Sequence, residues 1–287
     1  MLREKGVWEA LYADMPTTAL IRNLATLTRV GVIAPMDFQP AVAAIERIGQ
    51  NGGPRIHPLG VLSALLTYRQ GQGHRGKGAW QPVAQVVDAL DAAFERSFRQ
   101  APQTGQRLYL GVDVSGSMGY GEVAGTPGLT PRMAAAALAM AIARREPNHY
   151  IAGFSRADGR SRNIGTGNVM AHLDITARDS LTDAMAKTQA MDFGGTDCAL
   201  PMLDALAKSM PVDCFLILTD SETWAGAIHP VEALRKYRAE LGIAAKLVVV
   251  AMVSNGFSIA DPEDGGMLDI VGFDAAAPQL IADFAQY

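Results

Sequence analysis

The chain has 287 residues, of which 49% are hydrophobic and 19% are charged, and its formal net charge is −4. This apolar content can fill a large core and excludes a mostly disordered chain, and the length predicts one or two domains. Its two cysteines, Cys198 and Cys214, are too few for a disulfide scaffold or a four-cysteine zinc site. No apolar run reaches the roughly 18–20 residues of a membrane span, and the first residues lack the apolar core of a signal peptide. We therefore expect no membrane association and a reducing, cytoplasmic location.

The charge is divided unevenly along the chain. Residues 1–104 carry 11 Lys and Arg against 8 Asp and Glu, a balance of +3. Residues 105–287 carry 14 against 21, a balance of −7. Only the first part therefore has the sign that suits a phosphate backbone.

Helical patterns dominate residues 1–104. Apolar residues recur at three- and four-residue spacing after Pro16 (Leu20, Ile21, Leu24 and Leu27), and further helices are predicted near 42–48, 58–68 and 83–98. A short helix is also expected around Trp8. Because Gly and Pro turns separate these segments, we predict a stack of short helical hairpins.

The pattern changes after residue 104 to strands that alternate with helices. We expect strands near 108–112, 150–154, 214–218, 247–253 and 267–273, and helices near 131–145, 180–190, 230–241 and 278–285. Continuous apolar strands between amphipathic helices predict an α/β fold, with a mostly parallel, doubly wound sheet covered on both faces. The predicted domains are residues 1–104 and 105–287.

Hydroxyl and carboxylate side chains follow the predicted strands. Asp113, Ser115 and Ser117 come just after the first strand, with Thr196 in a Gly-Gly-Thr loop and Asp220 after a later strand. Parallel strands share a direction, so these three loops are expected at one edge of the sheet, where ligands bind in such folds. Hard cations prefer oxygen ligands, and the five side chains predict a Mg²⁺ site that would also suit Mn²⁺ or Ca²⁺. Taken alone, the Asp-x-Ser-x-Ser loop is also typical of a turn with capping residues.

These five residues resemble the metal-ion-dependent adhesion site of von Willebrand factor A domains. The resemblance implies that Ser115, Ser117 and usually Thr196 contact the cation, while Asp113 and Asp220 hold waters or complete the shell. It also implies an open position that can take the carboxylate of a protein partner.

Longer stretches resemble the C-terminal half of the Ro autoantigen family of TROVE-domain RNA-binding proteins. They include MPTTALIRNL at 15–24, RIHPLGVLSALLTY at 55–68, GGTDCALPM at 194–202 and SNGFSIADPEDGGMLDIVGFD at 254–274. The resemblance implies a segment of HEAT-like helical repeats, followed by a von Willebrand A domain. It implies binding of small noncoding Y-type RNA and of misfolded RNA ends in RNA quality control, with an exoribonuclease tethered through the RNA. In that family most of the helical ring precedes the equivalent of Trp8, so RNA binding by this chain alone is a separate question.

A Gly-rich segment at 71–76 matches the GxGxxG pattern, but a predicted helix precedes it where a nucleotide-binding fold needs a strand. We interpret it as a loop between helices, and two roles stay open. Arg69, His74, Arg75 and Lys77 could contact RNA phosphates beside Tyr68 and Trp80, or the loop could be merely solvated while both aromatic rings pack in the core.

The sequence contains no P-loop, no nucleophile elbow and no histidine beside the predicted metal. We therefore expect a binding protein without catalysis, the C-terminal part of a Ro-like ribonucleoprotein component. The alternative is a metal-dependent protein-adhesion module that binds no RNA by itself. A metal-dependent hydrolase is the third hypothesis, and it predicts turnover that Asp220→Ala abolishes.

Overall fold

The computed structural model describes residues 4–73, 78–100, 103–123, 128–156, 168–189, 196–220, 227–252, 259–272 and 277–287. The chain divides into two compact units. The helical unit comprises residues 1–101 and 125–129, and the α/β unit comprises residues 102–124 and 130–287. No helix among the described residues combines the length and the apolar character needed to cross a membrane.

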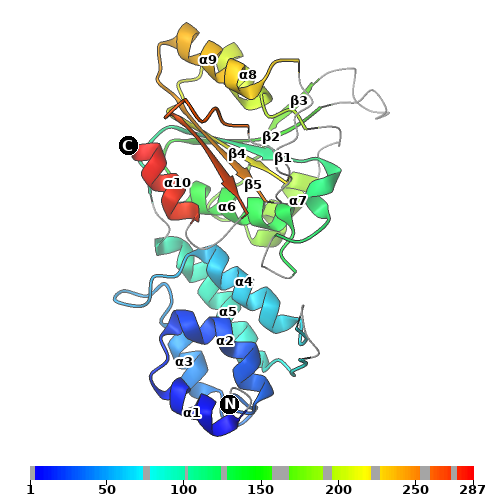
Figure 1. The fold of residues 1–287 in the computed structure, drawn as a ribbon, viewed down its shortest axis with the longest axis vertical. Coiled ribbons are helices and arrows are strands. Elements are labelled where there is room, and N and C mark those ends of the chain that lie inside the picture. The colour runs from blue at the N-terminus through cyan, green and yellow to red at the C-terminus, as the bar shows by residue number, and fades with distance from the viewer. Residues whose placement is uncertain are drawn as a thin grey trace. The chain divides into compact units, whose positions relative to one another are not determined.

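The helical unit is built from five α-helices in its described part, followed by a short 3-10 turn at Phe98–Gln100 (Figure 1). These helices are α1 (Lys5–Ala13), α2 (Thr17–Arg29), α3 (Gln39–Glu46), α4 (Pro58–Arg69) and α5 (Ala84–Ser97). Helix α5 packs against both α3 and α4, and α2 packs against α4. The apolar stripe predicted for α2 is the stripe that the unit buries, at Leu20, Ile21, Leu24 and Leu27.

A close helix contact fixes the turn after α3. Gly49 has a φ of +77°, and a Cβ there would lie 2.6 Å from the backbone carbonyl of Arg96 in α5. Only glycine adopts this conformation without strain, and only glycine leaves room for the neighbouring backbone. The Arg96 Nε–H donates to the Ile48 carbonyl (3.2 Å), which ties α5 to this turn.

The Gly-rich segment after α4 forms a hairpin at its base. Gly73 N–H donates to the Gly78 carbonyl (2.8 Å), and Trp80 N–H donates to the Gly71 carbonyl (2.9 Å). Residues 72 and 79 form an antiparallel bridge between these two bonds. Residues 71–73 and 78–80 therefore pair with each other between two helices, and helix α4 precedes them where a nucleotide-binding loop requires a strand.

The α/β unit contains a six-stranded sheet in the order β3-β2-β1-β4-β5-β6. All pairs are parallel except β2 with β3. The strands are β1 (Leu108–Asp113), β2 (His149–Arg156), β3 (Asn168–His172), β4 (Cys214–Thr219), β5 (Lys246–Ala251) and β6 (Met267–Val271). Every residue of β1 and β4 is buried, as expected for central strands of a sheet covered on both faces.

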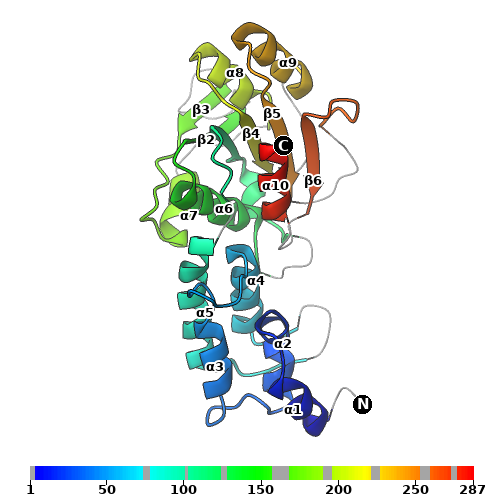
Figure 2. The ribbon, with the colours of Figure 1, turned by 90° about the vertical axis from the view of Figure 1, so that its left-hand side faces the viewer.

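Helices cover both faces of this sheet (Figures 1 and 2). One face carries α8 (Leu200–Ala207) and α9 (Pro230–Leu241), and the other carries α6 (Pro131–Arg145), α7 (Leu181–Gln189) and α10 (Ala277–Gln286). Tyr109, Phe215 and Leu247 of the sheet join Leu234 and Tyr237 of α9 in one buried cluster. The predicted α/β class, with a mostly parallel and doubly wound sheet after a helical segment, is confirmed.

Candidate functional site

The candidate site lies at the carboxyl edge of the two central strands. Asp113 is the last residue of β1, and Thr219 is the last residue of β4. The strands run parallel, with Val112 opposite Leu218, so Asp113 and Thr219 reach the edge at the same level. The sheet register thus places the loops after both strands side by side, where ligands bind in parallel α/β sheets.

Asp113 is the centre of the hydrogen bonds at this edge. The residue is 1% exposed, and its Oδ1 accepts a bond from the Ser115 N–H (2.8 Å). Oδ2 accepts bonds from the hydroxyls of Thr219 (2.8 Å) and Thr196 (3.1 Å). Burial raises the pKa of Asp113, the bonds from Ser115 and Thr219 oppose this rise, and the negative charge of Asp220 adds to it. One carboxylate therefore holds three separate loops together.

The two serines lie next to each other where a short 3-10 turn follows β1: Ser115 directly precedes the turn (Gly116–Gly119) and Ser117 lies within it. Their Oγ atoms are 3.0 Å apart. Oxygen ligands about 2.0–2.1 Å from Mg²⁺ at adjacent corners of an octahedron are about 2.9–3.0 Å apart, so this spacing fits one small cation. Ser115 is buried, whereas Ser117 is exposed, so the pair spans from the interior to the surface.

A glycine in β1 allows the Thr196 loop to come close. A Cβ at Gly111 would lie 2.6 Å from Cγ of Pro201, near the start of α8. The missing side chain lets α8 pack directly on the strand. Asp197, just before α8, is 3% exposed and accepts a bond from the Ala199 N–H (3.1 Å), so its carboxylate caps this turn. Thr196 immediately precedes that capped turn, which positions its hydroxyl toward Asp113.

The structure joins four of the five predicted cation ligands by hydrogen bonds, and it relates the fifth to them only by charge. Hydrogen bonds join Asp113, Ser115, Ser117 and Thr196 into one cluster. Asp220 contributes an electrostatic interaction with Asp113. Within the described residues, no group of three or more His, Cys, Asp and Glu side chains is placed to hold a metal. Any cation at this place would therefore need hydroxyl oxygens as ligands together with carboxylates.

Two residues of the site were missed by the sequence analysis. Asp220 was selected by the sequence analysis and its neighbour Thr219 was not. The position of Thr219 at the end of a strand parallel to β1 could have indicated that it belongs to the site. Arg132 of α6 is 5% exposed, and its Nη2 donates to the Ser115 carbonyl (3.1 Å). Burial lowers the pKa of Arg132, and the charge of Asp113 works in the opposite direction. Nothing in the sequence pattern connects Arg132 with the serine loop.

The residues predicted to contact RNA are placed only in part. Arg69, at the end of α4, is exposed, and its Nη2 is 3.9 Å from the carboxylate of Asp91. His74, Arg75 and Lys77 lie outside the described residues. Tyr68 is fully buried, and Trp80 is half-buried.

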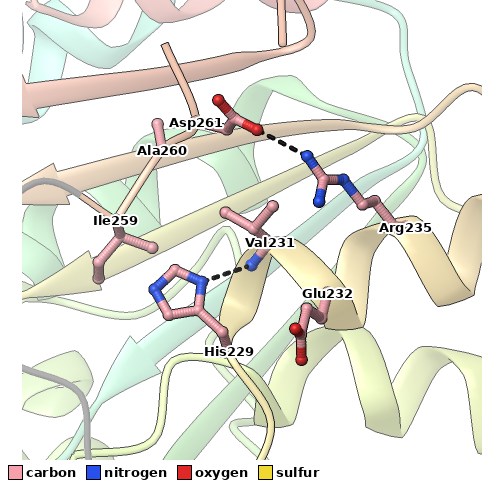
Figure 3. A pocket seen from close by; sticks show the side chains of 7 residues that line it. All are labelled: His229, Val231, Glu232, Arg235, Ile259, Ala260 and Asp261. Atoms are coloured by element: carbon pink, nitrogen blue, oxygen red, sulfur yellow. Dashed lines mark hydrogen bonds and ion pairs between the residues drawn. The ribbon is translucent and has the colours of Figure 1, made fainter. Parts of the chain in front are cut away.

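A second concavity, of about 310 Å³, lies between α9 and residues 259–261 (Figure 3). Two of its polar groups have partners: Arg235 pairs with Asp261 (2.6 Å), and His229 Nδ1 accepts a bond from the Val231 N–H (3.3 Å). The lining residues in the described part of the chain include no serine, threonine or cysteine. This pocket shares no residue with the Asp113 site.

Comparison with known proteins identifies both parts of the chain. Residues 107–285 match the model of the Ro60 vWA domain, and residues 2–67 match the model of the TROVE domain. A protein of Deinococcus radiodurans named RNA-binding protein RO60 is 47% identical over 99% of this chain and 52% of its own length. The protein of the same name from Caenorhabditis elegans is 39% identical over 99% of this chain and 42% of its own length.

A solved structure agrees with these matches. The crystal structure of the Deinococcus radiodurans RO (RSR) protein superposes with a TM-score of 0.87 and 47% identity, over 99% of this chain and 55% of that chain. This chain spans about half the length of the relatives it matches. The resemblance drawn from the sequence is confirmed, and the chain belongs to the Ro60 family of proteins with TROVE and von Willebrand A domains.

Proposed function

We propose that this chain corresponds to the C-terminal half of a Ro-like RNA-binding protein, in which the helical unit contacts RNA and the α/β unit docks a partner through a divalent cation. Both curated relatives carry the name RNA-binding protein. The RNA would be a small noncoding Y-type RNA or the end of a misfolded RNA, as the family resemblance implies. An exoribonuclease tethered through that RNA would be the further partner.

The RNA proposal rests on the exposure and the pairing of the arginines in the helical unit. Five of them are exposed, and within the described part of the chain their guanidinium groups make no hydrogen bond or ion pair: Arg22, Arg29, Arg47, Arg55 and Arg99. Between Glu46 and Asp88 the chain has no carboxylate side chain at all. Cations that are free of carboxylates are available to neutralise phosphates, which dominate the affinity for nucleic acid.

The α/β unit contrasts with this arrangement. Many of its cationic side chains are already paired with acids, including Arg107 with Asp213, Lys187 with Asp179, Lys208 with Asp204, and Arg238 with Asp264. Residues 105–287 also carry the −7 balance, from 14 basic and 21 acidic residues. This contrast favours the helical unit as the part of the chain that binds RNA. Arg69, His74, Arg75 and Lys77 would be among the residues that contact the RNA.

The cation would be held by the hydroxyl oxygens of Ser115, Ser117 and Thr196. Asp113 and Asp220 would supply the negative charge around it. A bound Mg²⁺, or Mn²⁺ or Ca²⁺, would provide a positive centre that attracts a carboxylate of a protein partner. In this proposal the site docks a partner and breaks no bond, and Asp113 keeps the three loops in place.

RNA binding by the whole chain tests the first half of the proposal. A fluorescently labelled single-stranded RNA is titrated with protein at several salt concentrations, with Mg²⁺ and with a chelator. We expect the logarithm of the association constant for RNA to fall linearly with log [salt], with a slope of about −0.7 per phosphate neutralised. At a given salt concentration, the chelator should leave this constant unchanged. Absence of binding at low salt would refute RNA binding by this chain.

The second candidate function is a protein-adhesion module without RNA binding, which the acidic balance of residues 105–287 favours. It predicts capture of a protein in the presence of Mg²⁺ that is lost with chelator and with Asp113→Ala. The same variant should leave RNA binding unchanged if the proposal above holds, because the arginines of the helical unit are untouched.

A further inference from the structure

The base of the hairpin after α4 has a face that is almost free of side chains. Residues 71–73 pair with residues 78–80 through the two backbone bonds described above. Side chains alternate between the two faces of an extended strand, so Gly78 and Trp80 share one face. A glycine in such a strand permits close approach of another group.

Arg29, the last residue of α2, occupies this glycine face. A Cβ built on Gly78 would lie 2.5 Å from Nη1 of Arg29, so the guanidinium fills the space that any side chain at position 78 would need. Arg29 is exposed, and its guanidinium has no hydrogen-bond or ion-pair partner within the described residues. Among the described residues it is therefore a cation placed against bare backbone, with no carboxylate that pairs with it.

The Trp80 ring is held by the end of α4. Its indole N–H donates to the Tyr68 carbonyl (2.9 Å). Tyr68 is itself fully buried, and its hydroxyl accepts a bond from the Val83 N–H (3.1 Å) and is 2.9 Å from the Thr28 hydroxyl. Trp80 thus has a fixed orientation, while part of the residue stays accessible.

We infer that Arg29 and Trp80 together form a subsite for single-stranded RNA, in which the guanidinium binds a phosphate and the indole stacks on a base. The inference rests on the proposed RNA-binding function and names two contact residues that the sequence analysis did not select as a pair. Single-strand sites combine a cation for the backbone with an aromatic platform for the base. A guanidinium binds phosphate through two parallel N–H groups, and a ring that is already oriented loses little freedom on binding.

The test uses the full chain and a fluorescein-labelled single-stranded 12-nucleotide oligouridylate, with binding followed by anisotropy across a salt series. Arg29→Ala should weaken binding about tenfold and reduce the salt slope by about 0.7, the value for one lost phosphate contact. Arg22→Ala is the matched control, because Arg22 is an exposed arginine of the same helix without a partner in the described residues. It should change both values clearly less than Arg29→Ala does, because only Arg29 belongs to the proposed subsite.

Two further variants separate position from charge. Gly78→Ala keeps every charge but displaces the Arg29 guanidinium, and it should weaken binding by an amount similar to Arg29→Ala.

Trp80→Phe removes the indole, so the RNA-dependent quenching of tryptophan fluorescence should decrease relative to the unmodified chain. A duplex of the same length should cause little quenching, because its bases are already stacked. Circular dichroism verifies that each variant is folded.

The outcomes distinguish this inference from the proposal on which it rests. If the unmodified chain binds the oligouridylate and Arg29→Ala binds equally well with the same slope, the subsite is refuted while RNA binding stands. If Arg22→Ala weakens binding as much as Arg29→Ala, the charge is diffuse and the subsite is again refuted. If the unmodified chain binds no RNA, both the proposed function and the subsite are refuted.

Discussion

At the residue scale, the carboxylate of Asp113 organises the candidate site. It is almost completely buried and accepts bonds from one backbone N–H and two threonine hydroxyls, which come from loops far apart in the sequence. Ionised carboxylates are costly to bury, and these bonds offset part of that cost. The cation proposed at the adjacent hydroxyls would offset more of it.

Thr219→Val tests the support that Asp113 receives. The valine keeps the shape of the threonine but removes the 2.8 Å hydroxyl bond to Oδ2. We expect the affinity for Mg²⁺ or Mn²⁺, measured by titration calorimetry, to fall about 10–100-fold, as is usual when a group supporting a metal ligand is lost. Thr188→Val is the matched control, because Thr188 is also a buried threonine, whose hydroxyl bonds a backbone carbonyl within α7. Equal metal affinity in both variants would contradict a supporting role for Thr219.

Asp113→Asn tests the charge itself. The amide oxygen can accept the Ser115 N–H bond, and the amide nitrogen can donate to the two threonine hydroxyls, since hydroxyls donate or accept. The buried negative charge is costly in the metal-free protein. We therefore expect the metal-free Asp113→Asn variant to have an unfolding free energy, measured in urea, equal to or higher than that of the unmodified chain. Metal binding should be lost. A variant that is destabilised and still binds Mg²⁺ would show that the carboxylate is structural and serves no cation.

At the scale of the elements, helix α4 begins with an unusual cap. His57 precedes α4, and its Nδ1 accepts a bond from the Leu59 N–H (3.2 Å), which occupies one of the otherwise unpaired amides of the first turn. Burial lowers the pKa of His57 from 6.5 to about 4. A protonated imidazole cannot accept this bond, so the cap requires the neutral ring.

The stability of the helical unit should therefore depend on pH. The unfolded chain takes up the His57 proton near pH 6.5 and the folded chain only near pH 4, so stability is full above pH 6.5 and declines as the pH falls toward 4. The loss reaches about 3 kcal/mol at the low end, given about 1.4 kcal/mol per pKa unit. Urea unfolding at several pH values measures it.

The control variant for this effect keeps a cap on helix α4 but removes the titratable imidazole of His57. His57→Asn retains an acceptor for the Leu59 N–H, and it should flatten the profile between pH 6.5 and 4. His229→Asn makes the same change at the cap of α9, where the histidine accepts a bond from Val231, and it should leave the profile of the helical unit in place. Identical profiles for the unmodified chain and His57→Asn would exclude His57 as the cause.

At the scale of the whole molecule, the two proposed ligands should act on different units. The candidate cation ligands all belong to the α/β unit, and the five exposed arginines named under the proposed function belong to the helical unit. This separation agrees with the opposite charge balances of the two parts of the sequence. Binding of each ligand should therefore stabilise the unit that holds its site.

Scanning calorimetry with each ligand measures this. Mg²⁺ at 100 times its dissociation constant should add about 2.7 kcal/mol to the unfolding free energy of the α/β unit. Hydrogen exchange locates the added protection, which we expect around β1 and β4, and Asp113→Asn should abolish it. Oligouridylate should instead protect α2 and α4. Protection of the helical unit by Mg²⁺ alone would contradict the assignment of the cation to the Asp113 site.

Much of this architecture could be predicted from the sequence, because it depends on local periodicity. Long apolar strands and amphipathic helices gave the α/β class, and the expected strands near 108–112, 150–154 and 214–218 correspond to β1, β2 and β4. The edge strand β3 and the helix α8 were missed. β3 has five residues and α8 has eight, too few for either period to appear clearly.

By itself, the sequence determined most of the elements, the family and the Asp-x-Ser-x-Ser loop, since all three depend on residues that are neighbours along the chain. The tertiary structure alone decided that Thr219 donates to Asp113, that Arg132 bonds the Ser115 carbonyl and that Arg29 lies against Gly78. Each of these contacts joins segments that are distant in sequence. The register of parallel strands and the packing of helices bring them together, and neither is encoded in the spacing of residues within one segment.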